Sequence, residues 1–266
     1  MIGIIGLGFV GNAILESLKY KGIINVKIYD KFKNNGIGKL EDLLETEFLF
    51  LCLPTPFNDI KKDYNLDSIH ENLSILNFKK YKGLVVIKST MVPGTTDKLV
   101  EKYENLNICN NPEFLSAKTA YKDFLNQKHI IIGISKRCRK IEKLINFYKK
   151  NWEGVKISEC TSYESESAKI FCNSFYAVKI QFFNELYLMC EKNNMSFENI
   201  RRLMINNDWI NPMHTKVPGT DGKLSYGGAC FPKDTSALLQ YLERNNLPRK
   251  VLEATVKERN EMRNNV

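Results

Sequence analysis

The stretch YGGACFPKD, residues 226–234, places a thiol where a nucleophile could act. Cys230 follows two glycines closely, precedes a proline by two positions and is followed by Lys233 and Asp234. A cysteine thiolate can add to a carbonyl carbon to give a covalent intermediate, and nearby cations favour the thiolate. The alternative is that Cys230 is a small buried apolar residue beside a turn, a common role for a single cysteine.

A second pair of chemically capable residues lies in residues 161–194, a segment that contains neither glycine nor proline. Lys169 and Asn173 are four positions apart, so on a helix they would share one face. An ammonium and an amide directed at one point could stabilise a developing alkoxide. A Lys-x-x-x-Asn pair after a nucleotide-binding domain is also similar to the pattern of β-hydroxyacid dehydrogenases. The alternative is an exposed lysine beside an asparagine in a helix interior.

The N-terminal residues carry a dinucleotide-binding pattern. Gly6, Gly8 and Gly11 form G-x-G-x-x-G between an apolar segment and a helix-length segment, which suits a tight turn that holds a pyrophosphate. A second apolar segment ends at Asp30, where a carboxylate would bind both ribose hydroxyls of NAD and repel the 2′-phosphate of NADP. The adjacent Lys31 leaves NADP open. The pattern predicts NAD as the cofactor, bound around Gly6, Gly8, Phe9, Val10, Gly11, Asp30 and Lys31.

Hydroxyl side chains follow two further apolar segments. Thr55 follows residues 48–53, while Ser89 and Thr90 follow residues 84–88. The carboxyl ends of parallel strands face the ligand crevice of a doubly wound sheet. We therefore expect these hydroxyls to bond to cofactor or substrate, although each alone is more often a turn or cap residue.

The elements that position these residues change in type near residue 160. Before it, short apolar segments alternate with helix-length segments such as 11–22, 67–79 and 96–104. This alternation predicts an α/β fold, a Rossmann-like doubly wound parallel sheet that forms an NAD-binding domain over residues 1–159. The predicted strands are 2–5, 25–29, 48–53, 84–88, 107–110, 129–134 and 155–157.

Residues 160–266 are predicted to form an all-helical central domain that carries the Cys230 loop. Apolar residues recur at helical spacing over 162–192, and Thr161 with Glu164 forms a possible capping box. Such a helix would be about 45 Å long at ~1.5 Å per residue, which favours a domain spine or a homodimer interface. A second helix is expected near 196–206, a loop over 207–233, and two helices over 234–264 broken at Pro248.

Composition excludes several other classes of function. The longest apolar segments are far too short to span a bilayer, and no secretory signal pattern is present, so neither a membrane segment nor a leader is expected. Seven cysteines without C-x-x-C spacing argue against a metal site and a disulfide framework, and fit a reducing cytoplasm. The net charge of +9 comes from scattered lysines rather than from a basic segment with interleaved aromatics, which argues against nucleic-acid binding.

Taken in order, these motifs resemble the UDP-glucose/GDP-mannose dehydrogenase family. The matching segments cover nearly all of residues 1–260 and are GLGFVG, PTP, IKSTMVPGTT, NPEFL, ESAKIFCNSFYAVKIQFFNE and GGACFPKDTSAL. The resemblance implies an NAD-dependent four-electron oxidation of UDP-glucose to UDP-glucuronate through a thiohemiacetal and a thioester on Cys230. It also implies a cytoplasmic homodimer, joined through the 162–192 helix, that acts in nucleotide-sugar metabolism and polysaccharide biosynthesis.

The resemblance implies a role for each matching residue. Lys169 and Asn173 would hold the oxygen of the oxidised carbon, Asp234 would act in proton transfer, and Thr90 would position water. The implied catalytic set is Cys230, Lys169, Asn173, Asp234, Thr90 and Glu113. The cofactor set gains Thr55, Ser89, Thr90 and Lys233. The implied substrate contacts are Phe114, Leu115, Lys169, Asn173, Tyr226, Gly227 and Gly228.

Three departures from the family pattern keep alternatives open. Ala117 stands where the family usually has the second Glu of PEFL-x-E, and Trp209 stands where an Arg usually reaches the partner's substrate phosphate. The family's usual C-terminal nucleotide-binding domain has no counterpart in these residues. One alternative is a catalytically weak or inactive remnant that binds NAD or nucleotide sugar and needs a partner chain. Another is a single-hydride β-hydroxyacid dehydrogenase, which would use the lysine–asparagine pair but not Cys230.

Overall fold

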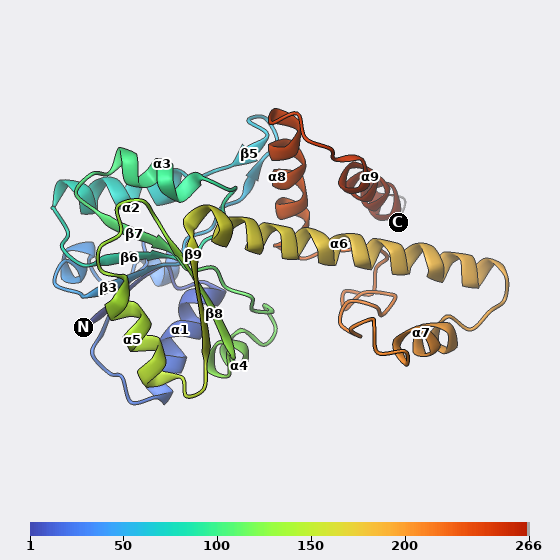
Figure 1. The fold of residues 1–266 in the computed structure, drawn as a ribbon, viewed down its shortest axis with the longest axis horizontal. Coiled ribbons are helices and arrows are strands. Elements are labelled where there is room, and N and C mark those ends of the chain that lie inside the picture. The colour runs from blue at the N-terminus through green and yellow to red at the C-terminus, as the bar shows by residue number, and fades with distance from the viewer. Residues whose placement is uncertain (265–266) are drawn as a thin grey trace. The chain divides into compact units, whose positions relative to one another are not determined.

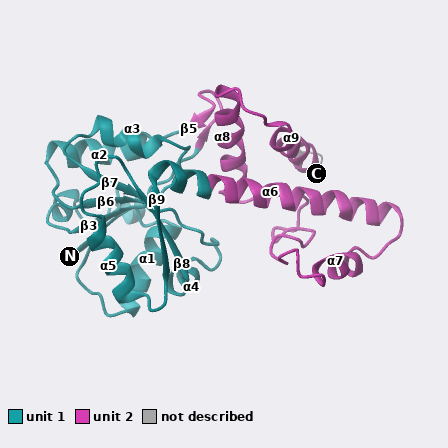
Figure 2. Cartoon of the chain, in the orientation of Figure 1, with its two compact units in different colours: residues 1–56, 64–169 teal, residues 57–63, 170–266 magenta. Residues whose placement is uncertain are grey.

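Residues 1–264 are described here by a computed structural model, shown in Figure 1. The chain divides into two compact units, coloured separately in Figure 2. Unit 1 comprises residues 1–56 and 64–169, and unit 2 comprises residues 57–63 and those from 170 onward. The chain passes between the units on either side of residues 57–63 and again inside one helix, α6 (Ser162–Lys192).

Unit 1 is built on a seven-stranded sheet with the order β2-β1-β3-β6-β7-β8-β9. Its strands are β1 (Ile2–Ile5), β2 (Val26–Tyr29), β3 (Phe48–Leu51), β6 (Leu84–Ile87), β7 (Asn107–Asn110), β8 (His129–Ile134) and β9 (Lys156–Thr161). Neighbouring strands are parallel except for the pair β7 and β8. The predicted doubly wound, Rossmann-like sheet is confirmed. The antiparallel pairing of β7 with β8 could not be predicted, because the sequence of an apolar strand does not show in which direction the strand runs in the sheet.

Helices cover both faces of this sheet, as its buried central strands require. Because successive side chains of a strand point to opposite faces, Ile4 and Phe50 lie in one core cluster while Ile5 and Leu49 lie in the other. The first cluster includes residues of α1 (Phe9–Tyr20), α4 (Ala120–Leu125) and α5 (Ile141–Asn151). The second includes residues of the 3-10 helix η2 (Leu40–Leu43), α2 (Asp67–Phe78) and α3 (Thr95–Lys102). A short 3-10 helix, η1 (Lys33–Asn35), follows β2.

Unit 2 is mainly helical. It contains most of α6 together with α7 (Phe197–Ile205), α8 (Phe231–Arg244) and α9 (Lys250–Asn264). The short strands β4 (Phe57–Asn58) and β5 (Asp63–Tyr64) pair with each other, and β4 contacts α8. Phe183, Cys190 and Phe197 form a buried cluster between α6 and α7. No helix within residues 1–264 is both long enough and apolar enough to cross a bilayer.

The predicted ends of the long helix are confirmed. Its capping box forms as expected, because the N–H of Thr161 donates to Glu164 Oε2 at 2.8 Å and the N–H of Glu164 donates to Thr161 Oγ1 at 3.2 Å. The helix that contains Asp234 begins earlier than predicted. α8 starts at Phe231 rather than at residue 234, since Pro232 in its first turn needs no amide hydrogen there and has a fixed φ that suits a helix.

Candidate functional site

The glycine-rich turn after β1 has the geometry of a phosphate-binding loop. Gly6 has a φ of +88°, and a Cβ on Gly11 would lie 1.9 Å from the carbonyl oxygen of Gly6. Helix α1 then begins at Phe9 with no side chain capping its first N–H groups. A Cβ on Gly8 would meet no atom within 4 Å, so the space beside the uncapped helix end is open. An uncapped helix N-terminus beside open space fits the pyrophosphate of a dinucleotide.

Asp30 stands beside this turn at the end of β2. Its Oδ2 accepts the N–H of Leu7 at 2.7 Å, and its Oδ1 accepts the N–H groups of Phe32 and Lys33 at 2.9 Å. Partial burial would raise the pKa of Asp30, but these backbone hydrogen bonds outweigh it and hold the pKa below its usual value. The carboxylate is therefore ionised and fixed in place, which suits an acceptor for ribose hydroxyls.

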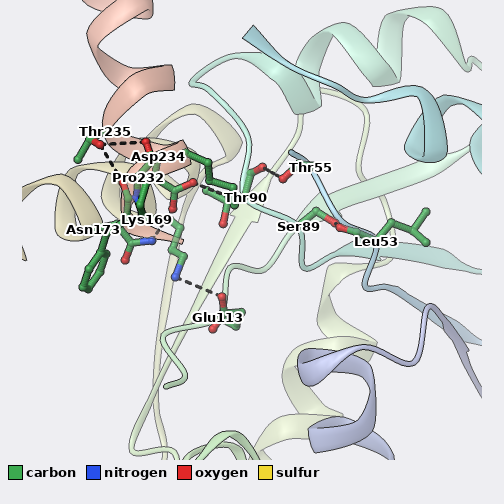
Figure 3. A network of polar contacts seen from close by, with 12 residues as sticks. Leu53, Thr55, Ser89, Thr90, Glu113, Lys169, Asn173, Pro232, Asp234 and Thr235 are labelled. Atoms are coloured by element: carbon green, nitrogen blue, oxygen red, sulfur yellow. Dashed lines mark hydrogen bonds and ion pairs between the residues drawn. The ribbon is translucent and has the colours of Figure 1, made fainter. Parts of the chain in front are cut away.

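Three other predicted cofactor residues bond to the protein itself. The hydroxyl of Thr55 donates to the carbonyl of Thr90 at 2.8 Å, and that of Ser89 donates to the carbonyl of Leu53 at 2.6 Å (Figure 3). These bonds tie the loop after β3 to the loop after β6. Lys31 pairs on the surface with a glutamate of α2 at 2.6 Å. A cofactor role for these side chains stays a prediction.

Lys169 is buried against the loop that follows β7, within unit 1. Its Nζ lies 3.3 Å from Glu113 Oε1 and 5.2 Å from the centre of the Phe114 ring, and the side chains of Lys169 and Glu113 are 6% and 10% exposed. Glu113 Oε2 also accepts the N–H of Leu115 at 2.7 Å. The ion pair is drawn in Figure 3. Four residues predicted from the sequence therefore gather in one place.

A second buried lysine of unit 1 is missed by the sequence patterns. Lys88 directly follows β6, and its Nζ donates to Asn111 Oδ1 at 2.9 Å, an oxygen that also accepts the hydroxyl of Tyr148 at 2.7 Å. Burial lowers the pKa of Lys88 to about 8. Its signal in the sequence is a charged residue placed directly after four apolar ones, which is unusual for a lysine at the end of a buried strand.

In unit 2, Cys230 is exposed at the N-cap position of α8. The partial positive charge at a helix N-terminus favours a thiolate there over a neutral thiol. All seven cysteines of the chain are thiols. Cys230 is therefore not the small buried apolar residue of the alternative interpretation, and its role as a nucleophile stays a prediction.

Asp234 lies one turn further along α8 and is fully buried. Its Oδ2 accepts a hydrogen bond from Asn173 Nδ2 at 2.6 Å, and its Oδ1 lies 2.5 Å from Lys233 Nζ. Asn173, itself buried, lies one helical turn beyond Lys169 on α6. The structure thus brings the predicted Asn173, Lys233 and Asp234 together, with Lys233 held against a carboxylate.

The remaining predicted substrate residues precede Cys230. The side chain of Tyr226 is buried and its hydroxyl lies 3.4 Å from Thr235 Oγ1, so only its backbone can reach a ligand. Gly227 is half-buried, whereas Gly228 is exposed. The catalytic candidate Thr90 is buried in the loop after β6.

Comparison with known proteins gives consistent matches along the chain. Residues 38–152 match the model of the UDP-glucose/GDP-mannose dehydrogenase family, NAD binding domain, and residues 163–261 match the central domain of that family. The UDP-glucose 6-dehydrogenase of Campylobacter jejuni is 31% identical over 98% of this chain and 72% of its own length. That of Rickettsia bellii is 30% identical over 83% of this chain and 51% of its own length.

A solved structure has a similar fold. The UDP-glucose dehydrogenase from the hyperthermophilic archaeon Pyrobaculum islandicum has a TM-score of 0.79 to this chain at 23% identity, covering 96% of this chain and 67% of its own. This chain therefore spans only part of the length of the relatives that it matches.

Proposed function

Because this chain belongs to the UDP-glucose/GDP-mannose dehydrogenase family, we propose that it oxidises the C6 alcohol of UDP-glucose to the carboxylate of UDP-glucuronate with NAD. The observation that carries the proposal is the exposed thiol of Cys230 at the N-terminus of α8, with the buried Asp234 one turn further on. A single-hydride dehydrogenase needs no such thiol, whereas an oxidation that continues past the aldehyde gains from one.

The proposed reaction removes four electrons from one carbon. NAD, bound at the glycine-rich turn, would supply the oxidising capacity by accepting one hydride in each of two rounds. Once C6 has become an aldehyde, the thiolate of Cys230 adds to it and forms a thiohemiacetal. Loss of the second hydride leaves a thioester on Cys230, water adds to its carbonyl, and the C–S bond breaks to release the carboxylate and restore the thiol.

The roles proposed for the other residues are those that the family resemblance implies. Lys169 offers a fixed ammonium, held by Glu113 at 3.3 Å, to the oxygen on C6. Asn173, one turn further along α6, donates to Asp234, and Asp234 is assigned the proton transfer. Thr90 positions the water that attacks the thioester.

We also propose that the protein is a homodimer joined through α6. Three aromatic side chains on this helix support it, because Phe171, Phe175 and Phe182 are 50%, 63% and 50% exposed. Apolar patches of this kind commonly mark an interface with another chain. Analytical ultracentrifugation at micromolar concentration should give twice the chain mass, and a monomer would contradict the proposal.

The decisive measurement is the yield of NADH per UDP-glucose with this chain alone. Two NADH per sugar are expected from the parent protein, and Cys230→Ser should abolish the uronate product. Cys138→Ser, a change at a half-buried thiol of unit 1, is the matched control and should keep the parent stoichiometry.

Other outcomes select the alternatives. Turnover of a hydroxy acid that survives Cys230→Ser would favour a β-hydroxyacid dehydrogenase. NAD binding without reduction by any nucleotide sugar would favour a remnant that needs a partner chain.

A further inference from the structure

Two arginines of α9 hold the backbone that leads to Cys230. Arg263 donates from Nη2 to the carbonyl of Ser225 at 2.9 Å and from Nη1 to Asp221 Oδ2 at 2.8 Å. Arg259, one turn earlier on the helix, donates from Nε to the carbonyl of Tyr226 at 3.3 Å. The Arg263 side chain is only 13% exposed. Both guanidinium groups therefore bind main-chain oxygens a few residues before the thiol.

The guanidinium of Arg263 also lies against Gly227. A Cβ at residue 227 would come within 2.6 Å of Nη1 and 2.8 Å of Cζ and Nη2. Non-bonded heavy atoms do not approach so closely, so any side chain at residue 227 must displace the guanidinium. Glycine at this position therefore lets the guanidinium of Arg263 stay where it lies.

Helix α6 holds the same backbone with two buried side chains. The N–H of Ser225 donates to Asn184 Oδ1 at 2.8 Å, and its hydroxyl donates to Gln181 Oε1 at 2.5 Å. Asn184 and Gln181 are 1% and 2% exposed. Ser225 is therefore bound through its N–H, its hydroxyl and, by Arg263, its carbonyl, five residues before Cys230.

We propose that Arg263, assisted by Arg259, is a positioning residue for Cys230. Its planar guanidinium fixes the backbone of residues 225–227, so that the exposed segment after it starts from one conformation and presents the thiol in one place. Misplacement of a reacting group by about 1 Å can cost on the order of a hundredfold in rate. This inference rests on the proposed role of Cys230 as the nucleophile.

The first test measures the loop itself. In hydrogen exchange followed by mass spectrometry, Arg263→Met should raise the exchange rate of the amides of residues 225–230 at least tenfold, and Arg263→Lys should give an intermediate value. Arg249→Met, which breaks an exposed ion pair with Glu243 outside the loop, is the control and should leave these amides unchanged. Unchanged exchange in Arg263→Met would overturn the proposal.

The second test uses the contact with Gly227. In the parent, Gly227→Ala should strongly increase the exchange rate of the amides of residues 225–230. In an Arg263→Met background the same substitution should raise this rate by less than twofold, because the guanidinium that would clash with the new Cβ is absent. Equal effects in both backgrounds would contradict the assigned contact. Where the parent oxidises UDP-glucose, Arg263→Met should lower kcat by tenfold or more and leave the KM for NAD within twofold, with partial rescue in Arg263→Lys.

Amide exchange and uronate formation together distinguish failure of the proposed function from failure of the positioning role of Arg263. A parent that shows the expected exchange pattern but forms no uronate would refute the proposed function and not the ordering of the loop. A parent that forms uronate, with a kcat that Arg263→Met does not change, would refute the positioning role alone.

Discussion

Replacing Lys169 by methionine tests how strongly the pair with Glu113 stabilises unit 1. The Nζ and Oε1 atoms are 3.3 Å apart, and neither side chain is more than 10% exposed. At an effective dielectric constant of about 20, unit charges at this separation attract by about 5 kcal/mol. Methionine keeps much of the length of the side chain but takes the ammonium away from a buried carboxylate. Loss of one partner from a buried pair costs about 3 to 5 kcal/mol.

The unfolding of unit 1 can be followed by itself through its tryptophan. Trp152 is 3% exposed in the core of unit 1, whereas Trp209 in unit 2 is 90% exposed, so Trp209→Phe leaves fluorescence to Trp152 alone. In this background, urea unfolding of Lys169→Met should show a free energy of unfolding lower by about 3 kcal/mol.

A double-mutant cycle isolates the pair. Glu113→Gln alone should lower the free energy of unfolding by a similar amount. In the double variant this free energy should fall by at least about 2 kcal/mol less than the sum of the two single effects, because neither charge is then left buried without its partner. Lys19→Met, which breaks an exposed pair with Glu16, should change the free energy of unfolding by no more than about 0.5 kcal/mol. A Lys169→Met variant as stable as its parent, or strictly additive effects, would refute the reasoning.

Three further predictions concern ionisable groups in the two units. Asp30→Ala should weaken NAD binding about tenfold or more by calorimetry, since the ribose hydroxyls lose an ionised acceptor; unchanged affinity would exclude this role. Burial lowers the pKa of Lys88 to about 8, so the unfolded chain binds more protons above that pH and stability rises toward pH 10. Between pH 7.5 and 9.5 the parent should gain about 2 kcal/mol in urea unfolding relative to Lys88→Met, and parallel pH profiles would contradict this. Burial and the carboxyl of Glu258 raise the pKa of Glu185 to about 6, so its contribution to stability is present below its unfolded pKa and is lost as pH rises through 6. Glu185→Gln should therefore raise the urea midpoint of unit 2, measured by circular dichroism, at pH 7.5 and not at pH 4.5, and a lower midpoint at pH 7.5 would count against the interaction.

Local patterns predicted most of the framework. Strands that are buried on both faces are nearly continuous apolar segments, so β1, β3 and β6 were predictable to within two residues. The ends of α6 could be predicted because its sequence lacks glycine and proline and begins with a capping box. The direction of β8 could not, because it depends on pairing with β7 rather than on composition.

Residues of the candidate site could be proposed from the sequence only where several chemically capable side chains stand in one motif. Cys230 and Asp234 stand within five residues of each other, and Asn173 was predictable from helical spacing and the family resemblance. The contact of Arg263 with the loop before Cys230 could not be predicted, because α9 carries several charged residues that look alike in the sequence. What distinguishes Arg263 is its contact with backbone about 40 positions away.

The hydrogen bond from Arg263 to the backbone of Ser225 also has a consequence for the design of shortened fragments of the chain. The match to the family's central domain ends at residue 261, two positions before Arg263. A fragment trimmed at that limit would retain the thiol, Asn173 and Asp234, yet lose the side chain that holds the backbone of Ser225. A fragment defined by the sequence match would therefore keep the candidate site residues but lose the contact of Arg263 with Ser225, and any dissection should keep α9 through residue 263.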